Sequence, residues 1–211
     1  MPYHAAGVKR LDPRARHNAA VVLLLVLVVF LAAAWVAAGD SLEVLDRGAH
    51  TLIREARDEM LVTPMWLISL LGSGYVLLPV TILVSAALWW RRHRALALWL
   101  PAIGLATALA LGLTKWLMSK PRPTLRGYGF PSGHVFGVTV FVIIGIYLLW
   151  RFDAPRRWQQ AAQAAGIAFV TIVGYSRIYV NAHWPSDVVG GLLAGIAFSL
   201  VVVLALDSRV R

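Results

Sequence analysis

The sequence contains no cysteine and few charged residues. Without cysteine, the chain forms neither disulfides nor thiolate metal sites, and its composition does not reveal a redox compartment. Charged residues make up 14% of the 211 residues, against about a quarter in soluble domains. The sequence also lacks internal repeats, low-complexity tracts and flexible linkers. The low share of charged residues argues against a soluble domain, and the composition predicts one membrane-embedded domain over residues 1–211.

Apolar sequence is abundant, since 59% of the residues are hydrophobic. A helix needs roughly 20 apolar residues to cross the hydrocarbon core of a bilayer. Apolar runs suited to this task, bounded by charge, occupy residues 18–38, 63–90, 95–117, 135–150, 161–180 and 188–206. The sequence therefore predicts an all-α integral membrane protein with six transmembrane helices. The fourth run is the shortest, and we expect its helix to begin one turn earlier.

The first run has a second interpretation, as a cleaved signal peptide, because basic residues precede it and Ala37 and Ala38 end it. Signal peptides have apolar cores of about 7 to 15 residues. The run exceeds that length, which favours a retained helix.

Basic residues set the expected orientation, because cytoplasmic loops collect Lys and Arg. Twelve of the 20 cations fall in the N-terminal tail 1–17, in 91–94, in 151–157 and in the C-terminal tail. Six of the ten acids fall in the first loop on the opposite side, residues 39–62. Both termini are therefore predicted to be cytoplasmic. Because the cations lie in short clusters and not on one basic face, the net charge of +10 does not indicate nucleic-acid binding.

The first outer loop, 39–62, carries apolar residues at helical spacing with charged residues between them. This pattern predicts an amphipathic helix lying on the outer membrane surface, as a docked connection or, alternatively, as a substrate gate. His50 is expected to be a surface residue of this helix. Elsewhere, small residues at four-residue spacing predict close helix packing. They are Gly104, Ala108 and Gly112, and then Gly191 and Gly195.

Polar residues collect at the outer ends of spans three to six. The five cations are Lys115, Lys120, Arg122, Arg126 and Arg177, and Asp187 is the one acid counted against them. Individually they have ordinary explanations, such as Lys115 extending to the interface or Arg177 pairing with Asp187. Together they exceed what one carboxylate neutralises. An excess of cations at this depth suits a phosphate or diphosphate ligand.

The stretch "PSGH", residues 131–134, opens the fourth span. If Ser132 is the N-cap, the backbone N–H groups of Gly133 and His134 point outward at the positive end of the helix dipole. Such a helix start is a seat for an anion. His134 is then placed to donate a proton to a leaving group.

The stretch "SRIYVNAHWPSD", residues 176–187, leads into the sixth span, which is expected to start near Trp184 because Pro185 suits a first helical turn. Asp187 would then lie one turn beyond His183 on the same face. A carboxylate on one imidazole nitrogen leaves the other nitrogen free to attack. Metal binding by His134, His183 and Asp187 is the alternative, which the surrounding cations disfavour.

With these residues in view, the chain resembles the type 2 phosphatidic acid phosphatase superfamily, the lipid phosphate phosphatases related to vanadium haloperoxidases. Its three-part signature is present in order. "KWLMSKPRP" (115–123) has Lys, six residues, then Arg-Pro; "PSGH" follows; and 176–187 has Ser-Arg, five residues, His, three residues, Asp. The catalytic motifs therefore span 115–187.

The resemblance implies that His183 is the nucleophile, that Asp187 orients it, and that His134 protonates the leaving oxygen. The phosphate oxygens would be held by Lys115, Arg122, Ser132, Gly133 and Arg177. No cofactor or metal is implied. Lys120 and Arg126 lie outside the signature and are possible secondary head-group contacts or solvated charges.

The predicted function is hydrolysis of a lipid phosphate or diphosphate, of the undecaprenyl diphosphate, phosphatidylglycerol phosphate or phosphatidic acid class. The reaction is expected at the outer face of a bacterial cytoplasmic membrane, through a phosphohistidine. The alternatives are phosphotransfer to a lipid or sugar through the same intermediate, and a transporter or silent scaffold. The sequence is silent on protein partners.

Overall fold

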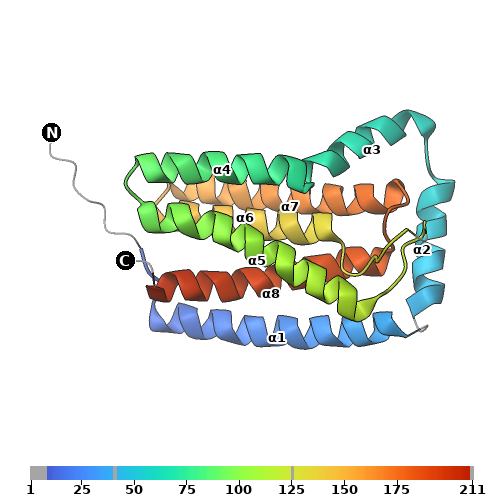
Figure 1. Ribbon diagram of the computed structural model, residues 1–211, viewed down its shortest axis with the longest axis horizontal. Helices are drawn as coiled ribbons and strands as arrows, with labels where there is room; N and C mark the ends of the chain where they lie inside the picture. The colour runs from blue at the N-terminus through green and yellow to red at the C-terminus, as the bar shows by residue number, and fades with distance from the viewer. Residues whose placement is uncertain (1–8, 40–41, 125, 210–211) are drawn as a thin grey trace.

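The protein is built from α-helices, as the sequence predicts (Figure 1). The structure, a computed structural model, describes residues 9–39, 42–124 and 126–209. Its helices are α1 (Pro13–Ala38), α2 (Glu43–Glu55), α3 (Glu59–Leu71), α4 (Gly74–Trp90), α5 (Arg94–Met118), α6 (Gly133–Arg151), α7 (Arg156–Tyr179) and α8 (Pro185–Arg209). Six stretches are long and apolar enough to span a membrane, with α3 and α4 together forming the second. The six predicted spans are confirmed, and α6 begins at Gly133, earlier than residue 135.

The second span is interrupted, which the sequence analysis did not predict. The N–H groups of Gly72 and Ser73 bond the carbonyls of Ser69 and Leu70 at 3.1 and 2.9 Å, which ends α3 in a tight turn. A Cβ at Gly72 would lie 2.7 Å from a methyl of Val173, so glycine lets α7 approach at the break. In Figure 1, α3 consequently leans away from the line of α4.

Helices α6 and α8 form the centre of the bundle, where α8 packs on α6 and on α1, while α6 also packs on α7. A Cβ at Gly191 would lie 2.7 Å from the carbonyl oxygen of Ser132, and one at Gly195 would lie 2.6 Å from Cβ of Thr139. The predicted packing role of these two glycines is confirmed. The same prediction is wrong for Gly104 and Gly112, because nothing lies within 4 Å of a Cβ at either and α5 is exposed there, also at Ala108.

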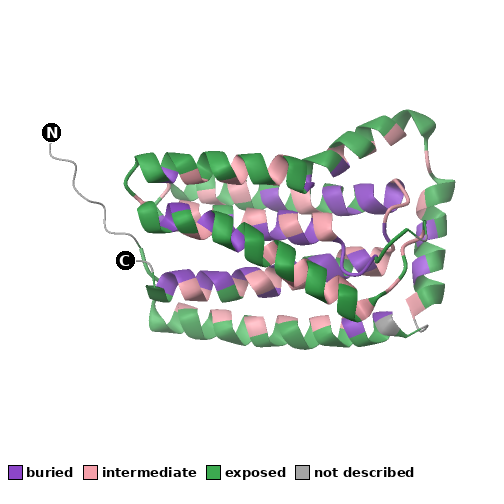
Figure 2. Cartoon of the chain, viewed as in Figure 1, coloured by how far each residue is buried: buried purple, intermediate pink, exposed green. Residues whose placement is uncertain are grey.

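The outer surfaces of the helices are exposed (Figure 2), and many of the side chains on them are large and apolar. Large apolar side chains on α1 such as Leu24 and Leu31 are each 63% exposed. Exposed tryptophans lie near both ends of the bundle, including Trp35 and Trp116 at one end and Trp90 and Trp158 at the other. Such a surface suits hydrocarbon, with aromatic rings at the interfaces. The chain is a multi-pass membrane protein.

The described parts near the two chain ends lie at the same end of the bundle, here called the terminal end. There the backbone N–H of Leu11 donates to Asp207 at 2.8 Å, and the N–H of Lys9 donates to the carbonyl of Arg151 at 3.2 Å. The rings of His93 and Phe152 pack 4.7 Å apart, so the α4–α5 and α6–α7 connections share this end. The basic clusters are thus together, as predicted. The predicted cytoplasmic tails include residues 1–8 and 210–211, which lie outside the described residues.

The first outer loop contains the predicted amphipathic helix, α2, but this helix is shorter than the loop. Residues 39–62 do not form one helix, because α2 ends at Glu55 and α3 begins at Glu59 (residues 40–41 lie outside the described residues). The face of α2 that packs on the protein carries Asp46 and His50, both buried, while Leu45 and Leu52 are 67% and 69% exposed. The interpretation of His50 as a surface residue is wrong. Apolar side chains can face lipid, whereas these polar ones find partners in the bundle.

Candidate active site

The two histidine-bearing motifs meet at the end of the bundle opposite the terminal end. Asn181 adopts a left-handed conformation (φ 61°) and reverses the chain after α7, and the N–H of His183 donates to the carbonyl of Arg177 at 3.2 Å. Helix α8 begins at Pro185, so Asp187 sits in its first turn. Nδ1 of His183 lies 3.1 Å from Oδ2 of Asp187, as predicted. The same Oδ2 accepts the backbone N–H of Trp184 at 3.1 Å.

The environment of His183 keeps its imidazole neutral. Its side chain is 1% exposed, and that burial lowers the pKa of His183 to about 4, against the hydrogen bond and charge of Asp187, which raise it. Arg177 and Lys115 lower the pKa of His183 further. With the carboxylate at Nδ1, the proton is assigned to that nitrogen, because a carboxylate only accepts. Nε2 then carries a free lone pair, as a nucleophile requires.

The start of α6 forms the second part of the site. Ser132 is the N-cap residue, as predicted, with φ −66° and ψ 116°. Its side chain makes no capping bond, and its buried Oγ has no hydrogen-bond partner among the described residues. A Cβ at Gly133 would lie 2.8 Å from a methyl of Leu111, so α5 approaches closely here. The helix start therefore offers a hydroxyl and backbone N–H groups for an anion.

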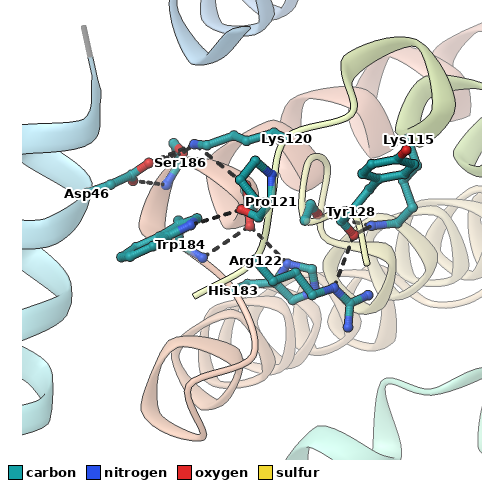
Figure 3. A network of polar contacts seen from close by, with 11 residues as sticks. Asp46, Lys115, Lys120, Pro121, Arg122, Tyr128, His183, Trp184 and Ser186 are labelled. Atoms are coloured by element: carbon teal, nitrogen blue, oxygen red, sulfur yellow. Dashed lines mark hydrogen bonds and ion pairs between the residues drawn. The ribbon is translucent and has the colours of Figure 1, made fainter. Parts of the chain in front are cut away.

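Two cations are held by the loop between α5 and α6 (Figure 3). Nζ of Lys115 donates to the carbonyls of Tyr128 and Gly129 at 2.9 and 3.0 Å, and Nε of Arg122 donates to the carbonyl of Tyr128 at 3.0 Å. A Cβ at Gly129 would lie 2.5 Å from Oδ2 of Asp187, so the loop lies directly against the carboxylate. These carbonyl contacts leave donors on both cations available for a ligand.

Arg177 is buried near the end of α7, and its guanidinium donates to Oγ of Ser69 on α3. Among the contacts of the described residues it forms no ion pair with Asp187, so that alternative is not realised. Instead Ser69 satisfies one N–H and the remaining guanidinium donors stay available. Ser69 is 1% exposed and was missed in the sequence, because a lone serine in an apolar span carries no signal.

The structure brings the predicted catalytic and phosphate-binding residues together. His134 interacts electrostatically with four of them, namely Arg177, His183, Arg122 and Lys115. Lys115 in turn interacts with Asp187 and Arg177. The backbone N–H of Ser132 donates to the carbonyl of Asp187 at 2.8 Å, which joins the α6 start to the dyad. Segments spread over about a third of the chain, residues 115–187, thus form one cationic site around a neutral imidazole.

The two cations outside the signature lie differently. Nζ of Lys120 donates to Oδ2 of Asp46 at 2.7 Å and to Oγ of Ser186 at 2.6 Å, and it lies 3.8 Å from Oδ1 of Asp187. Its ammonium is thus directed at protein carboxylates. Arg126 is exposed, and its head-group contact stays a prediction. The count of a single acid at this end is wrong, because α2 places Asp46 next to Lys120. The four-residue spacing of Asp46 and His50, which puts both on one face of a helix, was the available signal for a polar face that packs on the protein.

The alternative of metal binding by His134, His183 and Asp187 requires these side chains to point at one position. Over the part of the chain that the structure describes, no group of three or more His, Asp or Glu side chains is arranged to hold a metal ion. The donor set at the site is instead cationic, with Lys115, Arg122 and Arg177 around the dyad.

Comparisons with known proteins identify the family of the chain. Residues 124–211 match the PAP2 superfamily. The chain is 32% identical to an undecaprenyl-diphosphatase of Sulfolobus acidocaldarius over 154 residues, which is 66% of this chain and 68% of that protein. It is 25% identical to phosphatidylglycerophosphatase B of Bacillus subtilis over 188 residues, or 80% and 92% of the two chains.

A solved structure has the same fold. The crystal structure of a transmembrane PAP2 type phosphatidylglycerolphosphate phosphatase from Bacillus subtilis superposes with a TM-score of 0.81 at 20% identity. The match covers 90% of this chain and 97% of the other. With the three motifs, the six spans and these relatives together, the chain belongs to the PAP2 superfamily.

Proposed function

We propose that the protein is a phosphatase that hydrolyses the phosphate or diphosphate of a membrane lipid. The observation that carries this proposal is the buried His183–Asp187 pair, set among Lys115, Arg122 and Arg177 at one end of a lipid-facing bundle. A nucleophile, an orienting carboxylate and an anion seat are the parts that metal-independent phosphoryl transfer needs. The catalytic motifs and the six spans would form a single phosphatase domain.

In the proposed reaction, the cations hold the non-bridging phosphate oxygens together with Oγ of Ser132 and the N–H of Gly133. Nε2 of His183 forms a bond to phosphorus while the bond from phosphorus to the leaving oxygen breaks. His134 gives its proton to that oxygen. Asp187 stabilises the positive charge that develops on the His183 imidazole. The intermediate is a phosphohistidine.

The second half of the reaction restores the site. A water molecule gives a proton to His134, and its oxygen forms a bond to phosphorus while the bond to Nε2 of His183 breaks. Inorganic phosphate leaves. The cationic side chains supply throughout the electrostatic stabilisation that magnesium supplies in kinases.

The proposed substrates have an anionic head at the interface and tails in the bilayer. Undecaprenyl diphosphate and phosphatidylglycerol phosphate come first, because relatives carry the names undecaprenyl-diphosphatase and phosphatidylglycerophosphatase B. Phosphatidic acid and diacylglycerol pyrophosphate present the same chemistry. The proposed location is the outer face of a bacterial cytoplasmic membrane, supported by the basic clusters at the opposite end of the bundle.

The test is a panel of these four lipids offered to the purified protein in detergent with excess chelator. We expect release of inorganic phosphate from at least one lipid, inhibition by vanadate, and no release by the His183→Ala variant. A radiolabelled donor offered with lipid and sugar acceptors separates hydrolysis from phosphotransfer, because label would then appear in the acceptor. Absence of phosphate release from every lipid would reject the proposal.

A further inference from the structure

Lys120 lies on the side of Asp187 that does not face His183. The carboxylate of Asp187 is fully buried, and its two oxygens have different surroundings. Oδ2 accepts hydrogen bonds from His183 and Trp184, whereas Oδ1 has no hydrogen bond among the described residues. Nζ of Lys120 lies 3.8 Å from Oδ1, which is too long for a hydrogen bond but close for two opposite charges.

The position of this ammonium is determined by α2. Oδ2 of Asp46 accepts from Nζ of Lys120 at 2.7 Å and from Oγ of Ser186 at 2.6 Å, while Oδ1 of Asp46 accepts the backbone N–H of Ser186 at 2.8 Å (Figure 3). The side chains of Lys120 and Asp46 are 14% and 5% exposed. Asp46 therefore joins α2 to the first turn of α8, one residue before Asp187.

We propose that Lys120 is a positioning residue that acts on the nucleophile through Asp187, and that Asp46 holds Lys120 in place; the inference rests on the proposed function. A buried carboxylate is costly unless a cation or hydrogen bonds compensate its charge. Lys120 compensates Oδ1 and leaves Oδ2 to His183. Asp46 restrains the ammonium, so that it neither forms a direct hydrogen bond with Asp187 nor occupies the proposed phosphate-binding position.

This role differs from two simpler ones in what it predicts. A head-group contact would make Lys120 part of substrate binding, so its loss would raise KM. A purely structural clamp would make Lys120 necessary only because Asp46 is buried, so removing both charges would restore the enzyme. A positioning role predicts slower chemistry with unchanged binding, whether or not Asp46 keeps its charge.

The experiment compares Lys120→Met, Lys120→Arg, Asp46→Asn and the double variant Asp46→Asn with Lys120→Met, on the lipid that the wild type hydrolyses. We expect kcat of Lys120→Met to fall about 10- to 100-fold, the range for partners that orient ligands at metal sites, with KM within about two-fold. Lys120→Arg should retain most of kcat. The double variant should be as slow as Lys120→Met, because Asp187 lacks its cation in both.

Two inhibitors give an independent readout. Vanadate imitates the transition state and bonds the nucleophile, whereas phosphate requires only the phosphate-binding groups of the site. Loss of Lys120 should therefore weaken inhibition by vanadate about 10-fold or more while inhibition by phosphate stays within about two-fold. A structural defect would weaken both. If Lys120→Met does not fold, the double variant, which also removes the buried charge of Asp46, supplies the same comparison.

The matched control is Arg47→Met on the exposed side of α2, where Arg47 pairs only with Glu43 among the contacts of the described residues. Its kcat and KM should equal those of the wild type. Wild-type kcat in Lys120→Met, recovery in the double variant, or a change in KM alone would overturn the inference while the phosphatase assignment stands. An inactive wild type would instead reject the proposed function.

Discussion

The backbone N–H of Ser132 donates to the backbone carbonyl of Asp187 at 2.8 Å. This bond joins the first residue of the proposed phosphate-binding helix start on α6 to Asp187 on α8, the residue whose carboxylate is proposed to orient His183. Because this hydrogen bond links main-chain atoms, the position of the start of α6 relative to Asp187 does not depend on any exposed side chain. The same contact explains why a Cβ at Gly191 would lie 2.7 Å from the carbonyl of Ser132. Close approach of α6 and α8 is thus a requirement of the site.

Ser132→Ala should lower activity without lowering stability. Oγ of Ser132 is buried without a partner among the described residues, so its loss removes no bond of the resting protein. A hydrogen bond to a charged group contributes roughly 1.5–3 kcal/mol, so kcat/KM should fall by about 10-fold or more. Thermal unfolding in detergent should be unchanged or shifted upward. A fall in stability together with unchanged kcat/KM would contradict the proposed phosphate contact. Ser85→Ala, whose Oγ bonds its own helix at Thr81, is the control.

His183→Ala should reduce phosphate release to the background rate, because loss of a nucleophile can cost about 10⁶-fold. Asp187→Asn should reduce kcat by about 10³- to 10⁴-fold, since the imidazole loses the partner that selects its tautomer. His17→Ala, on the exposed surface of α1, should leave kcat unchanged. Turnover by His183→Ala above the background would exclude the proposed phosphohistidine.

The pH dependence follows from the lowered pKa of His183. Because burial lowers it to about 4, the imidazole is neutral above that pH and can attack, and the nucleophile is lost only as the pH falls through about 4. NMR of histidine-labelled, phosphate-free protein should therefore show one resonance titrating near 4 that is missing in His183→Gln. In Asp187→Asn the same resonance should titrate lower still, because Asp187 raises this pKa. Titration near the ordinary histidine value, about 6.5, would refute the neutral buried state.

The sequence predicted the spans and the motif residues well, because both depend on local patterns. Apolar runs bounded by charge locate α1 and α5 to within a few residues, and the start of α6 follows from Ser132 as a capping residue. The ordered spacing of Lys115, Arg122 and the histidines predicts a phosphate site, and the structure brings these residues together.

What the sequence did not reveal depends on pairs far apart in the chain. Asp46 and Lys120 are 74 residues apart, and Ser69 and Arg177 are 108 apart, so no local pattern joins them. The packing of Gly112 was misjudged for a related reason. Small residues at regular spacing show that a helix can be approached, and only the tertiary arrangement decides whether another helix of the same chain does so.

Gly190→Ala should destabilise the protein, and Gly104→Ala should not. A Cβ at Gly190 would lie 2.3 Å from the ring of Phe130, which is fully buried and stacks on Phe30 of α1 with ring centroids 6.1 Å apart. The ring has no free space, so α8 and the loop before Ser132 must separate. Overpacking of this kind costs about 1–3 kcal/mol.

Gly104 supplies the matched control, because a Cβ there meets nothing within 4 Å. Alanine at that position should keep or raise stability, since glycine inside a helix costs roughly 0.5–1 kcal/mol relative to alanine. Thermal unfolding of both variants in the same detergent measures the difference. Because Phe130 directly precedes the "PSGH" stretch, kcat of Gly190→Ala should fall as well, while kcat of Gly104→Ala stays at the wild-type value. Equal stability of the two variants would show that the α8–Phe130 contact does not hold the site in place.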